Sequence, residues 1–104
     1  MPSLHAMTPR NPLSDGQIAD ALSELPGWRH EGDALHKTFR CASFREAMSF
    51  LLRIAFEAEE QQHHPEIANV YGRVDLVLRT HDAGNAVTQN DVDLARAIER
   101  IAWI

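Results

Sequence analysis

The chain has 104 residues and a mass of 11.7 kDa, which is the size of one ordinary domain and too small for two independent cores. Hydrophobic residues make up 44% of the sequence and charged residues 24%, a balance typical of a globular domain and not of a disordered chain. The 15 acidic and 10 basic residues give a formal net charge of -5, which repels a phosphate backbone and argues against direct binding of nucleic acid.

A single cysteine, Cys41, excludes an intramolecular disulfide and a cysteine zinc site, which favours a cytoplasmic location. No stretch approaches the roughly 18 consecutive apolar residues of a membrane span, and residues 1–13 contain prolines without the apolar run of a signal peptide. We therefore expect residues 1–13 to form a flexible arm and residues 14–104 to form one cytoplasmic domain.

The first predicted element is a helix that begins with the capping-box residues Ser14 and Gln17 and ends before Pro26. Two short extended runs follow, at residues 28–31 and 35–40, with a Gly-Asp turn between them. This part of the chain is predicted to form a helix and then a β-hairpin.

The longest periodic segment begins at a second capping box, formed by Ser43 and Glu46. Its inward face is predicted to carry the apolar residues Phe44, Met48, Leu51, Leu52, Ala55 and Ala58. Phe50 and Ile54 extend the apolar surface sideways, further than one sheet would cover. We therefore expect part of this helix to pack against the same helix of a neighbouring chain, in a symmetric homo-oligomer.

Two further extended runs, at residues 67–71 and 73–80, flank Gly72 and are predicted to form a second hairpin. After a loop, Thr88 and Asp91 form a third capping-box pattern at the start of a last helix. The order α-β-β-α-β-β-α indicates an α+β fold of two layers, with three helices on one face of a four-stranded antiparallel sheet.

A histidine pair marks the end of the main helix, where Pro65 disfavours helical geometry in the residue before it. Glu59 lies one turn before His63 on the same face, where it can orient a ring or bias its charge. His81 follows the last predicted strand, at a point where sites are commonly assembled. The alternative is that His simply occupies an exposed polar helix end, where cations are mildly favoured.

Three kinds of chemistry are open to such a cluster. A zinc site is disfavoured because adjacent residues such as His63 and His64 point about 100° apart on a helix, unlike the i, i+4 pairs of helical zinc motifs. A cysteine nucleophile is disfavoured because no motif ties Cys41 to a histidine. Metal-free proton transfer remains, since an imidazole pKa of about 6.5 suits donation and acceptance near neutral pH. We predict no metal and no other cofactor.

The pattern Glu59-x-x-x-His63-His64-Pro65, followed by Tyr71, Thr80-His81 and Asp91, resembles the pterin-4a-carbinolamine dehydratase family. The likeness extends over residues 13–104. It implies an α+β fold with a four-stranded antiparallel sheet and three helices, assembled into dimers or tetramers. It also implies dehydration of 4a-hydroxytetrahydropterin to quinonoid dihydropterin and water, a step in tetrahydropterin cofactor recycling.

The resemblance makes His63, His64 and His81 the catalytic residues. The residues that it places at the pterin are Pro65, Thr80, Asp82 and Glu59. Dehydration needs an acid for the leaving hydroxide and a base for the N5 proton. We expect His63 and His81 to transfer protons and His64 to bind and polarise the pterin, with the division of acid and base roles left open. Asp91 is interpreted as a helix cap.

The alternative function, from another class, is a non-catalytic binding or dimerisation module that keeps the same fold. The presence of all three histidines favours the enzyme, because such a module has no chemical need for them together. The expected partners are a small pterin substrate and further copies of the chain, as a dimer or a tetramer. Neither nucleic acid nor a membrane is an expected direct partner.

Overall fold

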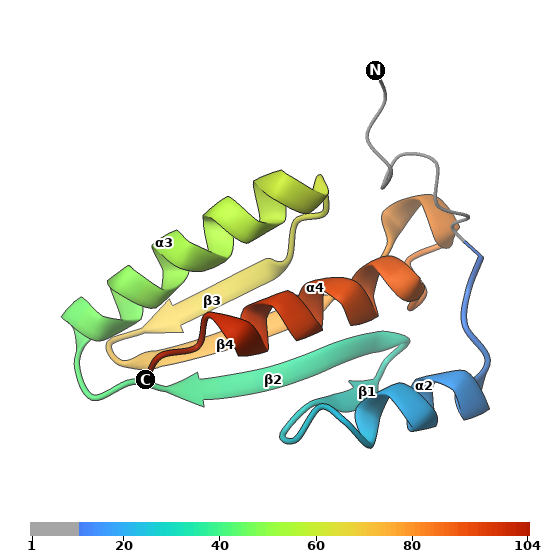
Figure 1. The fold of residues 1–104 in the computed structure, drawn as a ribbon, viewed down its shortest axis with the longest axis horizontal. Coiled ribbons are helices and arrows are strands. Elements are labelled where there is room, and N and C mark those ends of the chain that lie inside the picture. Colours follow the sequence, from blue (N-terminus) through green and yellow to red (C-terminus); the bar gives the residue numbers. More distant parts are fainter. Residues whose placement is uncertain (1–10) are drawn as a thin grey trace.

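The computed structural model describes residues 11–104 (Figure 1). In chain order, the elements are α2 (Asp15–Leu22), β1 (Arg29–Glu31), β2 (Ala34–Arg40), α3 (Phe44–Gln61), β3 (Glu66–Val70), β4 (Arg73–Leu78), the 3-10 helix η1 (His81–Ala83) and α4 (Gln89–Arg100). The predicted order of helices and strands, and with it the α+β fold class, is confirmed. No helix within residues 11–104 has the length and apolar character needed to cross a membrane.

The predicted N-terminal arm falls mostly outside the described residues, which begin at position 11. Leu13, its last residue, is half-buried and packs against the core. The Leu13 amide donates a hydrogen bond of 2.9 Å to the carbonyl of Val87, just before α4. This contact joins the start of the domain to the segment that leads into its last helix.

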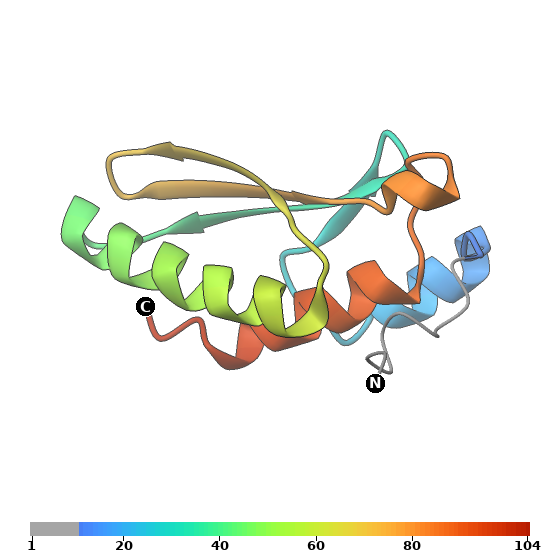
Figure 2. The same ribbon diagram turned by 90° about the horizontal axis from the view of Figure 1, so that it is seen from above.

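The sheet has the strand order β1-β2-β4-β3, and every neighbouring pair is antiparallel. The three α-helices cover one face, and within residues 11–104 no α-helix lies on the other face (Figure 2). On the central strand β4, Val74, Leu76 and Leu78 are buried under the helices, and the residues between them point to the helix-free face. The core therefore lies between this face of the sheet and the helices.

The helix starts follow from side-chain capping. Ser14 and Thr88 each complete a full capping box, in which the cap hydroxyl accepts from a backbone amide and the third helical residue bonds back to the cap. At α3 the Ser43 hydroxyl accepts from the Glu46 amide, but the Glu46 carboxylate accepts from the Ala42 amide instead. The α3 cap is therefore a variant of the predicted box.

The predicted inward face of α3 is correct for Ala58, which is buried, and for Leu51, which packs partly against the core, but it is wrong at other positions. Phe50 and Ile54, expected on its flanks, are fully buried in the core, and Phe50 packs edge-on against Phe39 of β2 with ring centroids 4.8 Å apart. Phe44 and Leu52, expected inward, are exposed. The helix carries two apolar stripes at regular spacing, and the stripe through positions 47, 50, 54 and 58 is the one that meets the sheet.

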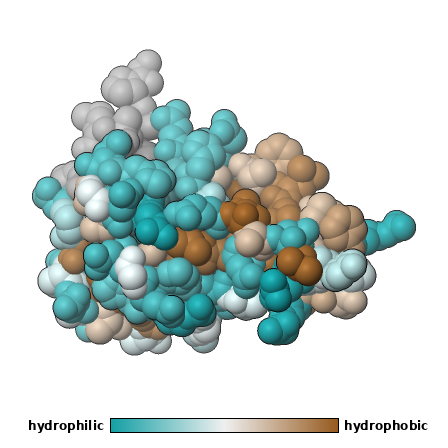
Figure 3. All heavy atoms as spheres, turned by 180° about the vertical axis from the view of Figure 1, so that it is seen from behind, coloured by the Kyte–Doolittle hydropathy of each residue, from teal (hydrophilic) through white to brown (hydrophobic). Residues whose placement is uncertain are grey.

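The second stripe leaves a large apolar surface uncovered. On α3, Phe44, Leu52 and Phe56 follow one another at multiples of four residues, and Leu52 and Phe56 are 61% and 70% exposed. Ile67 of the edge strand β3, which lies opposite the buried Leu76 and so on the face that the helices cover, is also exposed. We call these four residues the apolar strip. Figure 3 shows brown, apolar atoms gathered on the side of the molecule where α3 lies.

Candidate active site

One wall of the candidate site is made by the end of α3. Gln62 adopts a left-handed conformation with φ 52° and ψ 41°, and its amide donates to the carbonyls of Ala58 and Glu59. The His63 amide also donates to the Ala58 carbonyl, at 3.0 Å. The chain therefore turns sharply after Gln61, and His63 and His64 follow the turn instead of continuing the helix.

The facing wall is made by the segment that follows β4. Thr80 forms an isolated antiparallel bridge with Ala86, which closes a short loop around η1. His81 opens η1, and Gly84 ends it with a positive φ of 71°. The His81 Nδ1 donates to the side-chain oxygen of Asn85 at 2.6 Å, which fixes the direction of the ring.

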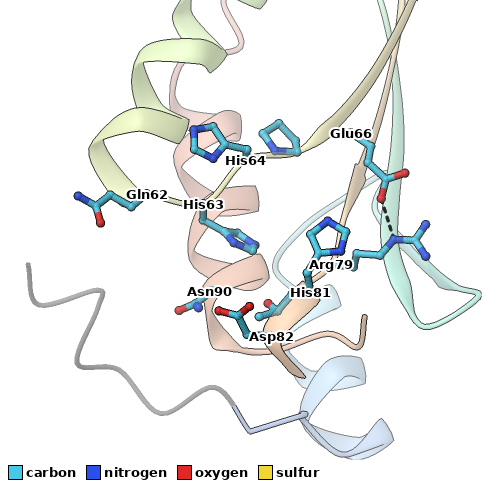
Figure 4. A pocket seen from close by; sticks show the side chains of 10 residues that line it. Gln62, His63, His64, Glu66, Arg79, His81, Asp82 and Asn90 are labelled. Carbon is cyan, nitrogen blue, oxygen red and sulfur yellow. Dashed lines mark ion pairs between the residues drawn. The ribbon is translucent and has the colours of Figure 1, made fainter. Parts of the chain in front are cut away.

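The two walls enclose a cavity of about 320 Å³ at this end of the sheet (Figure 4). Its lining residues are Gln62, His63, His64, Pro65, Glu66, Arg79, Thr80, His81, Asp82 and Asn90. Six of the seven residues predicted for the site are in this set, and Glu59 is not. The cavity volume is at the lower end of the range that small ligands occupy in proteins.

His63 is the most buried of the three histidines and contacts a carboxylate that is shielded from water. Its Nε2 donates to Oδ1 of Asp91 at 2.5 Å, and the two side chains are 11% and 0% exposed. With Nε2 carrying a proton for Asp91, Nδ1 is the nitrogen that can accept another.

Asp91 is itself held in place by a small buried network. Its Oδ2 accepts hydrogen bonds from the Thr80 hydroxyl at 2.8 Å and from the Thr88 amide at 2.9 Å. The Thr80 and Thr88 hydroxyls are 2.7 Å apart and bond to each other. Asp91 therefore caps α4, as predicted, and also bonds His63, a second role that the sequence analysis did not include.

The other two histidines are exposed at the mouth of the cavity. His64 Nε2 donates to Oε1 of Glu59 at 2.8 Å, in a pair whose side chains are 65% and 77% exposed. The expectation that Glu59 lies on the face of His63 is therefore wrong. The helix ends at Gln61, so the i, i+4 relation does not reach His63, and the turn at Gln62 brings His64 to Glu59 instead.

Four lining residues were missed by the sequence analysis. They are Gln62, Glu66, Arg79 and Asn90. Glu66 and Arg79 form an ion pair of 2.8 Å between Oε2 and Nε. Gln62, Glu66 and Arg79 each lie within two residues of a predicted site histidine, and that closeness is the signal in the sequence that pointed to them. Asn90 has no such neighbour and adjoins Asp91 instead.

Metal and thiol chemistry were also weighed from the sequence. Within residues 11–104, no group of three or more His, Cys, Asp or Glu side chains is arranged to hold a metal ion. Cys41 is half-buried and is not among the residues that line the cavity. Burial, and secondarily the Glu46 carboxylate, raise the pKa of its thiol, which lowers its reactivity at neutral pH.

Fold and site together define a class: an α+β protein whose sheet ends in a small cavity lined by three imidazoles, suited to proton transfer on a compact ligand. Residues 11–101 match the family described as "Pterin 4 alpha carbinolamine dehydratase". The chain belongs to this family, as its sequence pattern indicated.

Similar proteins support this membership. A protein of Opitutus terrae named "Putative pterin-4-alpha-carbinolamine dehydratase" is 59% identical over 92 residues, which cover 88% of this chain and 95% of that protein. The structure titled "transcriptional coactivator/pterin dehydratase" from Brucella melitensis is 37% identical with a TM-score of 0.84, and the match covers 88% and 99% of the two chains.

A more distant structure shares the fold alone. It is titled a pterin dehydratase-like protein and RuBisCO assembly factor of the alpha-carboxysome, and it is 24% identical with a TM-score of 0.64. The match covers 74% of this chain and 90% of that one. The same architecture therefore occurs in a protein whose title describes an assembly role.

Proposed function

We propose that this protein dehydrates a 4a-hydroxytetrahydropterin to the quinonoid dihydropterin and water. The observation that carries the proposal is the set of three imidazoles lining one cavity, with the most buried ring bonded to a fully buried carboxylate. Membership of the family supports the substrate class.

The reaction needs two proton transfers and no change of oxidation state. The C4a–O bond breaks and its electron pair leaves with the hydroxyl group, which an acid protonates to give water. A base removes the N5 proton, and the electrons of the N–H bond form the C4a=N5 double bond. Each such transfer by a positioned side chain contributes about 10²–10⁴-fold to the rate.

His63 is the base in this proposal. Because its Nε2 donates to Asp91, the ring takes up the N5 proton at Nδ1, and the buried carboxylate stabilises the resulting imidazolium. The Thr80 hydroxyl and the Thr88 amide donate to Oδ2 of Asp91, and these bonds hold the carboxylate with Oδ1 directed at His63. The positive charge on the protonated His63 ring is then balanced by the negative charge of Asp91, so no buried charge is left unpaired.

His81 is the acid for the leaving hydroxide. Its Nδ1 donates to the Asn85 side chain, so the opposite nitrogen, Nε2, is the one that exchanges a proton with the substrate. The ring is exposed, which lets water return the proton after each turnover. His64 binds and polarises the pterin from the mouth of the cavity, with Glu59 orienting its ring.

A non-catalytic module remains the competing function, and the distant assembly factor is the reason to test it. The Asp91 network argues for catalysis, because binding through an exposed surface does not require a histidine held by a buried carboxylate. The test is to add purified protein to a reaction that generates the 4a-hydroxypterin and to follow its absorbance. We expect decay faster than the spontaneous rate, and an unchanged rate would favour the module.

We also propose that the chain forms a homo-oligomer through the apolar strip of Phe44, Leu52, Phe56 and Ile67. Their exposure leaves apolar area in contact with water that a second copy would bury. Phe50 and Ile54, which the sequence analysis expected to extend this surface sideways, are fully buried and take no part in it. The strip lies along α3 and the edge strand β3, so both elements would take part.

Phe56→Glu is expected to split this oligomer into monomers, because burying a carboxylate without a partner costs several kcal/mol. Sedimentation equilibrium measures the change as a drop in mass to that of one chain. Ala19→Glu adds the same charge to an exposed position of α2 and should leave the mass unchanged. A wild-type protein that sediments as a monomer at micromolar concentration would contradict the proposal.

A further inference from the structure

The side chain of Asn90 has no part in the proton transfers described above. Asn90 lines the cavity and is only 1% exposed. Its side-chain oxygen, Oδ1, is buried and has no hydrogen-bond partner within residues 11–104. An unpaired buried acceptor is rare in native proteins, because the oxygen gives up its hydrogen bonds to water and gains none in return.

Most of the other polar side chains that line the cavity have partners in the protein. His63, His64 and His81 each form a hydrogen bond with another side chain, and Glu66 forms an ion pair with Arg79. The unpaired oxygen of Asn90 is therefore a particular feature of this residue and not a general property of the cavity.

The start of α4 does not need the Asn90 side chain. Asn90 is the second residue of the helix, and its backbone amide donates to the Thr88 hydroxyl at 3.2 Å. Asp91 completes the capping box by accepting from the Thr88 amide. Asn is also a poor helix former, because its side chain competes for backbone hydrogen bonds. An apolar side chain of the same size would therefore suit the fold at least as well.

A ligand that satisfies this oxygen has to bring a hydrogen-bond donor close to the reacting atoms. Asn90 adjoins Asp91, the carboxylate that bonds the proposed base His63, and in the view of Figure 4 it lies below the His63 ring and beside Asp82. The Asn90 carboxamide also carries its own donor, Nδ2, next to the oxygen. The group that matches an acceptor and a donor side by side is a cyclic amide, which presents its N–H and C=O on one edge.

A pterin has such an edge beside the carbon that loses its hydroxyl group. The carbonyl carbon C4 is bonded to C4a, and N3–H is the next position in the pyrimidine ring. We propose that Asn90 binds this ring, with Oδ1 accepting from N3–H and Nδ2 donating to the carbonyl at C4. The inference rests on the proposed function and adds a binding residue that is separate from the histidines.

The test measures equilibrium binding of two unreactive ligands, a 7,8-dihydropterin and its N3-methyl derivative, by isothermal titration calorimetry. The wild type should prefer the N3–H ligand about tenfold, which corresponds to one hydrogen bond. Asn90→Leu should lose this preference by binding the N3–H ligand about tenfold more weakly. Its free energy of unfolding should stay the same or rise, because the substitution removes an unpaired buried oxygen.

Gln89→Leu is the matched control. Gln89 precedes Asn90 on α4 and carries the same amide group, but it does not line this cavity, and its Nε2 donates to Asp93 at 2.9 Å. We expect the opposite pattern from this variant. It should lose a little stability with its hydrogen bond and bind both ligands as the wild type does.

The outcomes separate this inference from the proposed function. If the wild type binds the dihydropterin and dehydrates its substrate, but Asn90→Leu keeps the preference for N3–H, the oxygen bonds only water and the inference is overturned while the dehydratase function stands. An Asn90→Leu variant that is less stable and loses affinity equally for both ligands also overturns it, because the role is then structural. If the wild type neither binds nor dehydrates a pterin, the proposed function fails and the inference fails with it. Circular dichroism establishes that each variant is folded, and the smaller Asn90→Ala provides a second variant that must also lose the preference.

Discussion

His63→Ala is expected to slow dehydration by about 10²–10⁴-fold, because it removes the base that takes the N5 proton. His81→Ala is expected to cause a loss of the same order by removing the acid for the leaving hydroxide. Each loss should appear in kcat more than in KM, since proton transfer develops in the transition state. Stopped-flow absorbance of the 4a-hydroxypterin measures both constants.

Two further variants separate chemistry from folding. His63→Gln keeps an amide that can donate to Asp91 but cannot transfer a proton, so we expect it to be as inactive as His63→Ala and more stable. His30→Ala removes an exposed histidine of β1, outside the cavity, and should leave the rate unchanged. A His63→Gln variant with wild-type kcat would contradict the assignment of His63 as base.

Asp91→Asn is expected to lower kcat by about 10²–10⁴-fold while keeping the size of the side chain. The carboxylate accepts from three donors, on His63, Thr80 and Thr88, and an amide presents one oxygen and one N–H₂ group in its place. Either His63 changes tautomer or a buried donor loses its acceptor. We expect the free energy of unfolding to fall by about 1–3 kcal/mol as well.

Gln17→Ala provides the control for the capping part of this effect. Gln17 is the third residue of α2 and accepts a hydrogen bond from the Ser14 amide, the same capping bond that Asp91 makes at α4. We expect a small loss of stability in urea unfolding and no loss of dehydration rate. If Asp91→Asn loses only the stability that Gln17→Ala loses, with kcat unchanged, then Asp91 is a cap and not a positioning residue.

The features that the sequence predicted correctly are local ones. The capping boxes at Ser14 and Thr88 and the two hairpins depend on residues within a few positions of each other, so their signals survive in a single sequence. The order of elements then restricts the fold to few arrangements. The histidine pair was recognisable because it lies beside Pro65 at the end of a helix.

The features that escaped prediction depend on long-range contacts or on one unusual dihedral angle. His63 and Asp91 are 28 residues apart, and no periodicity links them. The left-handed turn at Gln62 has no glycine to mark it, yet this turn decides that Glu59 bonds His64. The inward face of α3 was mistaken because both stripes are apolar, and contact with Phe39 and the rest of the sheet selects one of them.

The measurement that tests the proposed mechanism most directly is the dehydration rate of a folded double variant, His63→Ala with His81→Ala. Circular dichroism and the unfolding midpoint first establish that the variant keeps the fold. If the two histidines supply the base and the acid, the 4a-hydroxypterin should decay in its presence at close to the spontaneous rate. Decay as fast as with wild-type protein would contradict the mechanism and move catalysis away from this cavity.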